Sequence, residues 1–228
     1  MATRTAPRES LTRVRILETA VTLADEDGVE SLSMRRIAQR LGVVPMALYK
    51  HVANKEEILD GLVEAIVEEI EAPPPDADWK TAVRRRILSA RRALLRHRWA
   101  ARLIATRTDP GPAMLAYMDS MIGLFLAGGF SIDLTHHAMH AMGSRLLGFT
   151  QELYDDTGEI DRDDEVEMYR MMADRYPHLY ELARSVFHDD ETVVGGQGCD
   201  DQFEFEFALD LLLDGIERLR DRRSRPEP

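Results

Sequence analysis

Residues 33–52, SMRRIAQRLGVVPMALYKHV, contain two short helical patterns that are separated by a glycine. Ser33 is a favourable N-cap for the first pattern, in which apolar residues recur three and four positions apart. Gly42 can adopt the left-handed backbone conformation that ends a helix, and Pro45 suits the first turn of the next helix. The stretch therefore predicts a helix-turn-helix.

The sequence on both sides of this stretch supplies the helices on which it would pack. A pattern upstream predicts a helix that begins near Ser10 and ends at Gly28, and Asn54 is a suitable cap for a longer helix downstream. With the apolar positions facing inward, the second short helix keeps five residues on its outer or rim positions. They are Met46, Ala47, Tyr49, Lys50 and His51. In such motifs this helix lies in the major groove of DNA, although short patterns of this kind also arise by chance in helical proteins.

Charge is distributed unevenly along the chain. Residues 1–55 hold nine Lys and Arg against six Asp and Glu, a net charge of +3, whereas the whole chain carries −12 and the remainder therefore −15. Binding to polyphosphate depends on the charges at the contact, so a small basic head can bind DNA although the body is acidic. A non-specific DNA-binding protein, the first alternative, is expected to be basic throughout.

Composition indicates a globular protein of 228 residues with 44% hydrophobic and 31% charged residues. A single cysteine, Cys199, excludes an internal disulfide framework and a cysteine-based zinc site. No apolar run approaches the roughly 20 residues that cross a bilayer, and charges interrupt the N-terminus where a signal peptide would be apolar. We therefore expect a cytoplasmic protein.

The rest of the chain is also predicted to be helical, which makes the fold all-α. Pro73, Pro74 and Pro75 cannot continue a helix, so they mark the boundary between a domain at 1–72 and a second at 73–228. The helices expected in the second domain span 78–97, 98–108, 110–128, 132–155, 164–187 and 202–223. Loops are expected at 155–164 and 188–201.

A family resemblance rests on LYKHV at 48–52 and NKEEIL at 54–59, with Gly28 and the helix at 33–41 upstream. Over residues 11–62 the chain closely resembles the DNA-binding head of the tetracycline-repressor (TetR) family. Weaker landmarks of the ligand domain follow at 78–79 (DW), 94–98 (LLRHR), 106–107 (TR) and 129–131 (GFS). The resemblance implies a homodimeric repressor whose heads read the two halves of a palindromic operator, and whose C-terminal domains bind a small-molecule effector and dimerise through about 132–153 and 202–220.

The resemblance also assigns roles to individual residues. Arg35 matches a position that contacts a base edge, and an arginine there can donate two hydrogen bonds to guanine. Tyr49, His51 and Lys55 match phosphate-contacting positions, whereas Lys50 lies where the family varies. The complete predicted DNA-binding set is Ser33, Arg35, Met46, Ala47, Tyr49, Lys50, His51 and Lys55.

Val44 departs from the pattern, because many members have Ser or Thr before the proline that opens the recognition helix. The valine lacks a side-chain cap worth about 1 kcal/mol and a hydroxyl for phosphate. Together with Met46 and Ala47 it gives the helix an apolar leading edge that suits thymine methyl groups. We therefore predict A·T-rich half-site centres.

Tetracycline-binding members use a histidine to hold the magnesium ion of the bound drug. The corresponding position in this chain is Leu103 or Ile104, and neither residue can ligate a metal. An asparagine that binds the drug in those members corresponds to Arg86. Tetracycline, a metal and a cofactor are therefore not expected. Eleven methionines suggest an adaptable apolar cavity, although each residue could equally be ordinary core. The predicted lining is Arg86, Leu103, Met114, Met118, Met121, Phe125, Met139, His140, Met142 and Phe149.

Two further clusters leave alternatives open. His136 and His140 lie four apart on one helical face next to His137, so a metal-dependent or other helical enzyme using them, with Asp133, is the second alternative. No third ligand or catalytic motif accompanies them.

The segment 80–107 has ten basic residues and no acid. These residues either neutralise the acidic segment 155–167 or provide Arg86 or Arg102 for an anionic effector.

Overall fold

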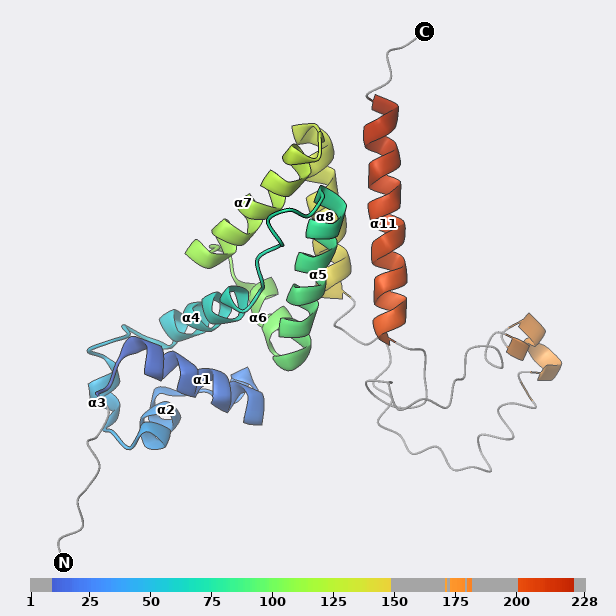
Figure 1. The fold of residues 1–228 in the computed structure, drawn as a ribbon. Helices are drawn as coiled ribbons and strands as arrows, with labels where there is room; N and C mark the ends of the chain where they lie inside the picture. Colours follow the sequence, from blue (N-terminus) through green and yellow to red (C-terminus); the bar gives the residue numbers. More distant parts are fainter. Residues whose placement is uncertain (1–9, 149–170, 172, 179, 182–200, 224–228) are drawn as a thin grey trace, which may run out of the picture. The chain divides into compact units, whose positions relative to one another are not determined.

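The structure, a computed structural model, describes residues 10–148, 171, 173–178, 180–181 and 201–223. Every regular element in these ranges is a helix, which confirms the all-α prediction (Figure 1). The chain divides into two compact units, residues 1–150 with 220–228, and residues 151–219. Among the described helices, none combines the length and apolarity that a membrane crossing requires.

Three helices form the N-terminal head: α1 (Arg13–Asp27), α2 (Met34–Leu41) and α3 (Pro45–Leu48). The helix expected to begin near Ser10 instead begins after Thr12, whose hydroxyl accepts a hydrogen bond from the Arg15 N–H. Thr12 is also a favoured N-cap, although a weaker one than serine, and it lies closer to the first buried position, Ile16. A short 3₁₀ turn at Val29–Ser31 then leads into α2.

The turn between α2 and α3 has the local chemistry that the sequence predicts. The Ser33 hydroxyl accepts from the Arg36 N–H at the start of α2, and Gly42 ends that helix with φ of +67°. Val44 precedes α3 without a side-chain cap, as expected of a valine. Buried apolar residues hold the three helices together, at about 1.5–3 kcal/mol for each large side chain. They include Ile16, Ala20, Leu23, Ile37, Ala38, Leu48 and Val52.

Helix α4 (Lys55–Glu68) leads from the head into the rest of the first unit (Figure 1). Asn54 caps it by accepting from the Glu57 N–H. Its N-terminal part packs on α1, where a Cβ on Gly61 would lie 2.6 Å from a methyl carbon of Leu17. Further along, α4 contacts α5, α6 and α7.

The body of the first unit consists of α5 (Trp79–Arg96), α6 (Ala100–Thr106), α7 (Pro112–Ala127) and α8 (Ile132–Gly148). Asp78 caps α5 and accepts from the Lys80 and Thr81 N–H groups. Trp79, Phe125 and Phe130 form an aromatic cluster with ring centroids 4.6–5.9 Å apart. A Cβ on Gly128 would lie 2.6 Å from the Trp79 ring, so glycine permits this packing.

Helix α11 (Asp201–Arg223) is the long helix expected at 202–223. It has two apolar faces, as the sequence indicates. Phe205, Leu209 and Leu213 are fully buried, whereas Phe203 and Phe207 stack on one another with exposed fractions of 62% and 54%. The helix expected at 164–187 lies largely outside the described residues, and so do the loops at 155–164 and 188–201.

We expect Gly42→Ala to destabilise the protein by about 1–2 kcal/mol, because a Cβ is unfavourable in the left-handed conformation. No atom lies within 4 Å of the added Cβ, so the cost comes from the backbone alone. Gly123→Ala is the matched control. Gly123 lies exposed in the interior of α7 with equally open surroundings, so alanine should stabilise the protein by about 0.5–1 kcal/mol. Urea unfolding at one protein concentration measures both, and equal midpoints would contradict the assigned turn.

Candidate functional site

The outer side of α2 has three arginines in different environments. Arg36 is paired with Asp27, and Arg40 Nη1 lies 3.1 Å from Glu26 Oε1. The hydrogen bond from Arg40 lowers the pKa of Glu26. Arg35 is exposed and has no ion pair within the described part of the chain. Two of the three cations are therefore used inside the head, and Arg35 is left for an external partner.

Helix α3 and its flanks present the remaining predicted DNA-binding residues at the surface. Met46 and Tyr49 are 71% and 48% exposed, and Lys50 is also exposed. The residues Ala47, His51 and Lys55 are half-buried, and Ser33 is exposed with its oxygen already accepting the α2 cap bond. The inward residue of α3, Leu48, is fully buried. All eight predicted residues are thus at least partly exposed on α2, α3, the start of α4 and the residues next to these helices.

The junction between α3 and α4 is fixed by Glu57. Its carboxylate accepts from the Ala53 N–H at 2.7 Å and from Arg13 Nε at 3.3 Å. The backbone hydrogen bond is the main reason that the pKa of Glu57 is lowered. Glu57 therefore ties α1 to the turn that carries His51 and Lys55, which positions the phosphate donors next to α3. A phenol, an imidazole and an ammonium group all donate to phosphate oxygens, whereas Arg35 can reach a base edge.

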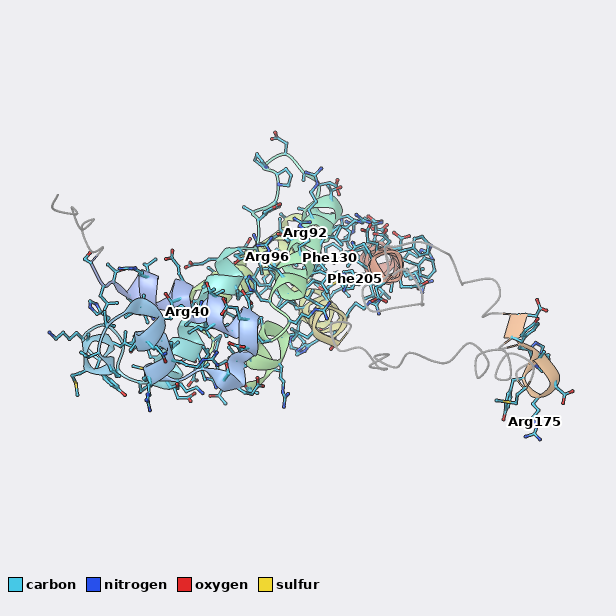
Figure 2. All side chains as sticks on the ribbon, turned by 90° about the horizontal axis from the view of Figure 1, so that it is seen from below. Arg40, Arg92, Arg96, Phe130, Arg175 and Phe205 are labelled. Atoms are coloured by element: carbon cyan, nitrogen blue, oxygen red, sulfur yellow. The ribbon has the colours of Figure 1, made fainter. Side chains whose placement is uncertain are left out.

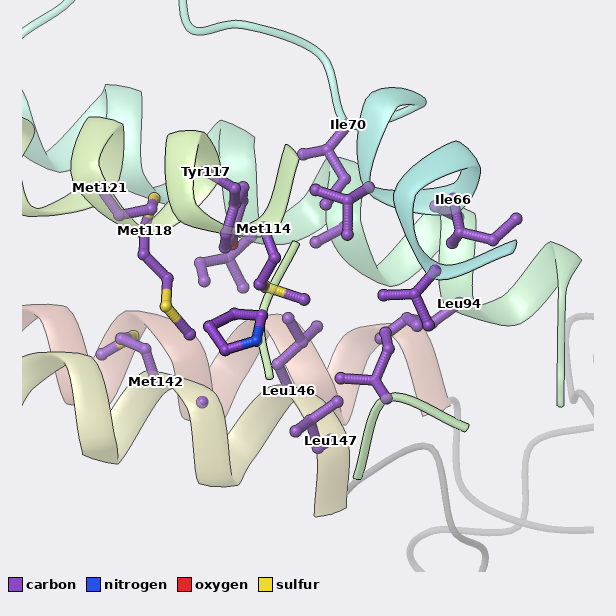
Figure 3. A pocket seen from close by; sticks show the side chains of 18 of the residues that line it. Ile66, Ile70, Leu94, Met114, Tyr117, Met118, Met121, Met142, Leu146 and Leu147 are labelled. Carbon is purple, nitrogen blue, oxygen red and sulfur yellow. The ribbon is translucent and has the colours of Figure 1, made fainter. Parts of the chain in front are cut away.

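A cavity of about 330 Å³ lies between α4, α5, α7 and α8. Residues at the end of α6 and in the loop after it also line this cavity. Figure 3 shows Met114, Met118 and Leu146 projecting toward one another into this space. The lining is apolar except for Arg107 and the Tyr117 phenol. It consists of Val63, Ile66, Val67, Ile70, Ile87, Ala90, Ala93, Leu94, Ile104, Arg107, Pro110, Met114, Tyr117, Met118, Met121, Met139, Met142, Gly143, Leu146 and Leu147.

Five of the residues predicted for the effector pocket line this cavity, and all five are methionines: Met114, Met118, Met121, Met139 and Met142. Four others lie elsewhere. Leu103 is buried while its neighbour Ile104 lines the cavity, Phe125 belongs to the Trp79 cluster, and His140 is exposed next to His136. Phe149 lies outside the described residues.

Arg86, the fourth of these residues, is buried behind the cavity wall. Its guanidinium carbon lies 4.8 Å from the centroid of the Tyr117 ring. Burial lowers the pKa of Arg86 and raises the pKa of Tyr117, since both charged forms lose contact with water. Arg102, the other arginine considered for an anionic effector, is 82% exposed and lies 3.8 Å from Glu30.

Three lining residues of α4 were not predicted, Val63, Ile66 and Val67, nor was Ile70 just beyond the helix. The available signal was that α4 is apolar on more than one face, which indicates contacts on two sides. The sequence pattern could not show that one of these contacts is an open space. Leu146 and Leu147 of α8 were missed for the same reason.

The acidic side of α4 is bonded to the segment that borders the cavity. Arg107 Nη1 lies 2.9 Å from Glu56 Oε2 and 3.1 Å from Asp60 Oδ1, and these hydrogen bonds raise the pKa of Arg107. One turn further along, Glu64 accepts from the Ala113 N–H at 2.7 Å. Residues 107–113 are therefore held by three successive turns of the helix that begins beside α3.

A second polar cluster joins the head to the body. His97 is 4% exposed, with Nδ1 2.8 Å from Asp25 of α1 and Nε2 3.1 Å from Glu69 at the end of α4. Trp99 also donates to Asp25, at 2.7 Å. Residues of α1, α4 and the α5–α6 corner thus meet around one imidazole, which limits how far the head can tilt.

Some of the basic residues at 80–107 have partners nearby. Arg92 and Arg96 project from α5 (Figure 2) and pair with Glu71 and Glu69. The acidic segment 155–167, which was expected to neutralise this helix, lies outside the described residues.

The histidines of α8 lie together, with the His136 and His140 ring centroids 4.6 Å apart. Within the described ranges no group of three His, Cys, Asp or Glu could hold a metal ion.

Comparisons with known proteins match both parts of the chain. Residues 16–62 match the family model described as bacterial regulatory proteins, tetR family, and residues 72–220 match the tetracyclin repressor-like C-terminal domain. The class C tetracycline repressor protein of Escherichia coli is 30% identical over 92% of both chains.

Solved structures with the same fold include ActR of Streptomyces coelicolor in complex with actinorhodin. It is 26% identical with a TM-score of 0.72, and the match covers 92% of this chain and 99% of that one. The Q116A variant of TetR from Acinetobacter baumannii AYE, in complex with minocycline, is 28% identical with a TM-score of 0.63. That match also covers 92% and 99% of the two chains.

We expect Arg35→Ala to weaken binding to a selected DNA site by about 10- to 100-fold, because a bidentate arginine–guanine contact contributes about 1–3 kcal/mol. Arg40→Ala is the matched control on the same helix, and it should change the Kd by less than about threefold, because Glu26 already engages that guanidinium. Fluorescence anisotropy at one salt concentration measures both. Equal losses would show that Arg35 has no special role.

Selection of binding sites from random DNA tests the apolar leading edge of α3. Val44 and Met46 are 67% and 71% exposed, so their methyl groups can reach thymine methyls in the major groove. We expect half-sites with A·T pairs at their centres, and Val44→Ser should relax that preference. Half-sites with guanine or cytosine at every central position would refute the prediction.

Proposed function

This chain belongs to the tetR family of bacterial regulatory proteins, and on that premise we propose that residues 1–72 bind the operator, while residues 73–228 dimerise and bind the effector together with residues 63–70. The protein is a ligand-responsive, DNA-binding transcriptional repressor. Regulators of this family act as dimers and are generally not enzymes. The family matches at 16–62 and 72–220 support the proposed division.

We propose that the operator contacts are made by Arg35 and by the residues of α3 and its flanks. The observation that carries this proposal is the difference between Arg35, which is exposed without an ion pair in the described chain, and Arg36 and Arg40, which are paired with acids of α1. Tyr49, Lys50, His51 and Lys55 are accessible beside it. Together they supply one base-reading group and several phosphate donors.

We propose that the cavity of about 330 Å³ is the effector site. Its volume suits a small molecule, and its lining comes from five different helices or their ends. Solved relatives support this assignment, since ActR is a tetR-family protein that is seen with actinorhodin bound. The histidine that holds magnesium in tetracycline-binding members corresponds to Leu103 or Ile104 in this chain, and neither side chain can ligate a metal.

Helix α4 connects the two proposed sites. It begins after Asn54, next to the recognition helix, and its C-terminal half supplies Val63, Ile66 and Val67 to the cavity wall, with Ile70 just beyond its end. A ligand that fits the cavity better when α4 is displaced shifts the population toward that position. The recognition helices of a dimer then no longer match successive major grooves, which are about 34 Å apart.

The test is a titration of the purified protein against the DNA that flanks its own gene, with and without unrelated competitor, across salt concentrations. We expect saturable binding to one palindrome that resists competitor, with a linear fall of log K against log salt. Binding that competitor DNA abolishes would instead indicate a non-specific DNA-binding protein. No binding to any DNA would refute the repressor and reopen the enzyme alternative at His136 and His140.

A further inference from the structure

We propose that the effector is an apolar, mainly aromatic molecule with one acidic oxygen group, and that this group binds Arg107 and draws it away from Glu56 and Asp60. The inference rests on the proposed effector site and adds the chemical class of the ligand. It also names the contact through which the ligand acts on α4.

The body of the ligand follows from the cavity wall. Eighteen of its twenty residues present only apolar side chains or a glycine, and five are methionines. A molecule with several polar groups would lose their hydrogen bonds to water here without replacement. Methionine sulfurs contact aromatic rings favourably, and flexible methionine side chains adapt to a flat ligand. The Tyr117 ring, held against Arg86, adds a rigid aromatic surface.

The acidic group follows from Arg107, which is the only charged residue among the described residues that line the cavity. Its Nη1 is bonded to Glu56 and Asp60, but its Nε is buried and has no hydrogen-bond acceptor among the described residues. A guanidinium can offer Nε and a second nitrogen together to one carboxylate. Nε is enclosed in this position, so an acidic oxygen in the cavity would satisfy this unpaired donor once the Arg107 side chain turns away from Glu56 and Asp60.

The competition between ligand and protein acids favours the ligand for a physical reason. The side chains of Glu56 and Asp60 are 67% and 59% exposed, whereas that of Arg107 is only 22% exposed. Water can therefore solvate the two carboxylates when they are released, but it cannot replace an acceptor inside the cavity. Glu64, the next acid on this side of α4, accepts from the Ala113 N–H through Oε2 and does not line the cavity, while its Oε1 is buried without a hydrogen-bond partner among the described residues.

The release of Glu56 and Asp60 would act directly on the DNA-binding head. Both residues lie in the first two turns of α4, immediately after the turn that holds His51 and Lys55. Without Arg107, these turns lose their bond to the segment at 107–113. The N-terminal part of α4 can then move with the head, and operator affinity falls.

The experiment compares two probes of the same shape, 2-anthracenecarboxylate and the neutral 2-anthracenecarboxamide, by calorimetry with the full-length protein. We expect the acid to bind at least tenfold more tightly than the amide and to weaken operator binding when saturating. Arg107→Gln should remove this preference, with about a tenfold loss for the acid and little change for the amide, because a charge-assisted hydrogen bond is lost.

Two further variants separate this role from a merely structural one. Glu56→Gln with Asp60→Asn removes the competing acids but keeps Arg107, so the acid should bind more tightly and the amide should not. Gly143→Phe places a ring at a cavity-lining position where nothing lies within 4 Å of the added Cβ, so it should weaken both probes.

Equal affinities for acid and amide, or equal losses of both in Arg107→Gln, would overturn the proposal, and so would the failure of both probes to bind the parent protein. Operator binding is measured on the same samples without a probe. If it persists while the probes fail, the ligand class is wrong and the repressor stands. If it is absent, the proposed function itself fails.

Discussion

The architecture depends on the burial of α4 on two sides. Near Gly61 it packs on α1, where the glycine allows Leu17 to approach, and its second half forms a wall of the cavity. A helix in these two environments cannot shift at one end without a response at the other, because packed interiors deform little. The same fourteen-residue helix therefore both packs against the head and forms part of the cavity wall.

Polar contacts set the limits of that movement. The His97 imidazole lies between Asp25 and Glu69, with Nδ1 2.8 Å from an Asp25 oxygen and Nε2 3.1 Å from a Glu69 oxygen. This cluster holds the C-terminal end of α4 against α1, whereas Arg107 holds its N-terminal turns. The two contacts differ in burial, since His97 is enclosed and the acids that bind Arg107 face water. We therefore expect the buried His97 cluster to stay in place and the exposed ion pairs of Arg107 to break more readily.

Local chemistry was predictable from the sequence, and long-range contacts were not. Ser33 and Asn54 cap their helices and Gly42 ends α2 as predicted, because these roles depend only on neighbouring residues. The first cap was misplaced at Ser10, because Thr12 offers the same chemistry two residues later. Of the ten residues predicted to line the cavity, the five methionines do so. Arg107 and the lining residues of α4 were not predicted. Periodicity identifies the buried face of a helix, but not what that face meets.

The pairing of Arg36 and Arg40 with acids of α1 has a consequence for the search along the chromosome. In the described head, Arg35, Lys50 and Lys55 are the cations without an internal ion pair, so under the proposed function this described part of each subunit would neutralise few phosphates. Attraction to arbitrary sequence is then weak, and residence times on decoy sites are short. Such a protein leaves wrong sites quickly and is retained mainly where the base pairs themselves fit.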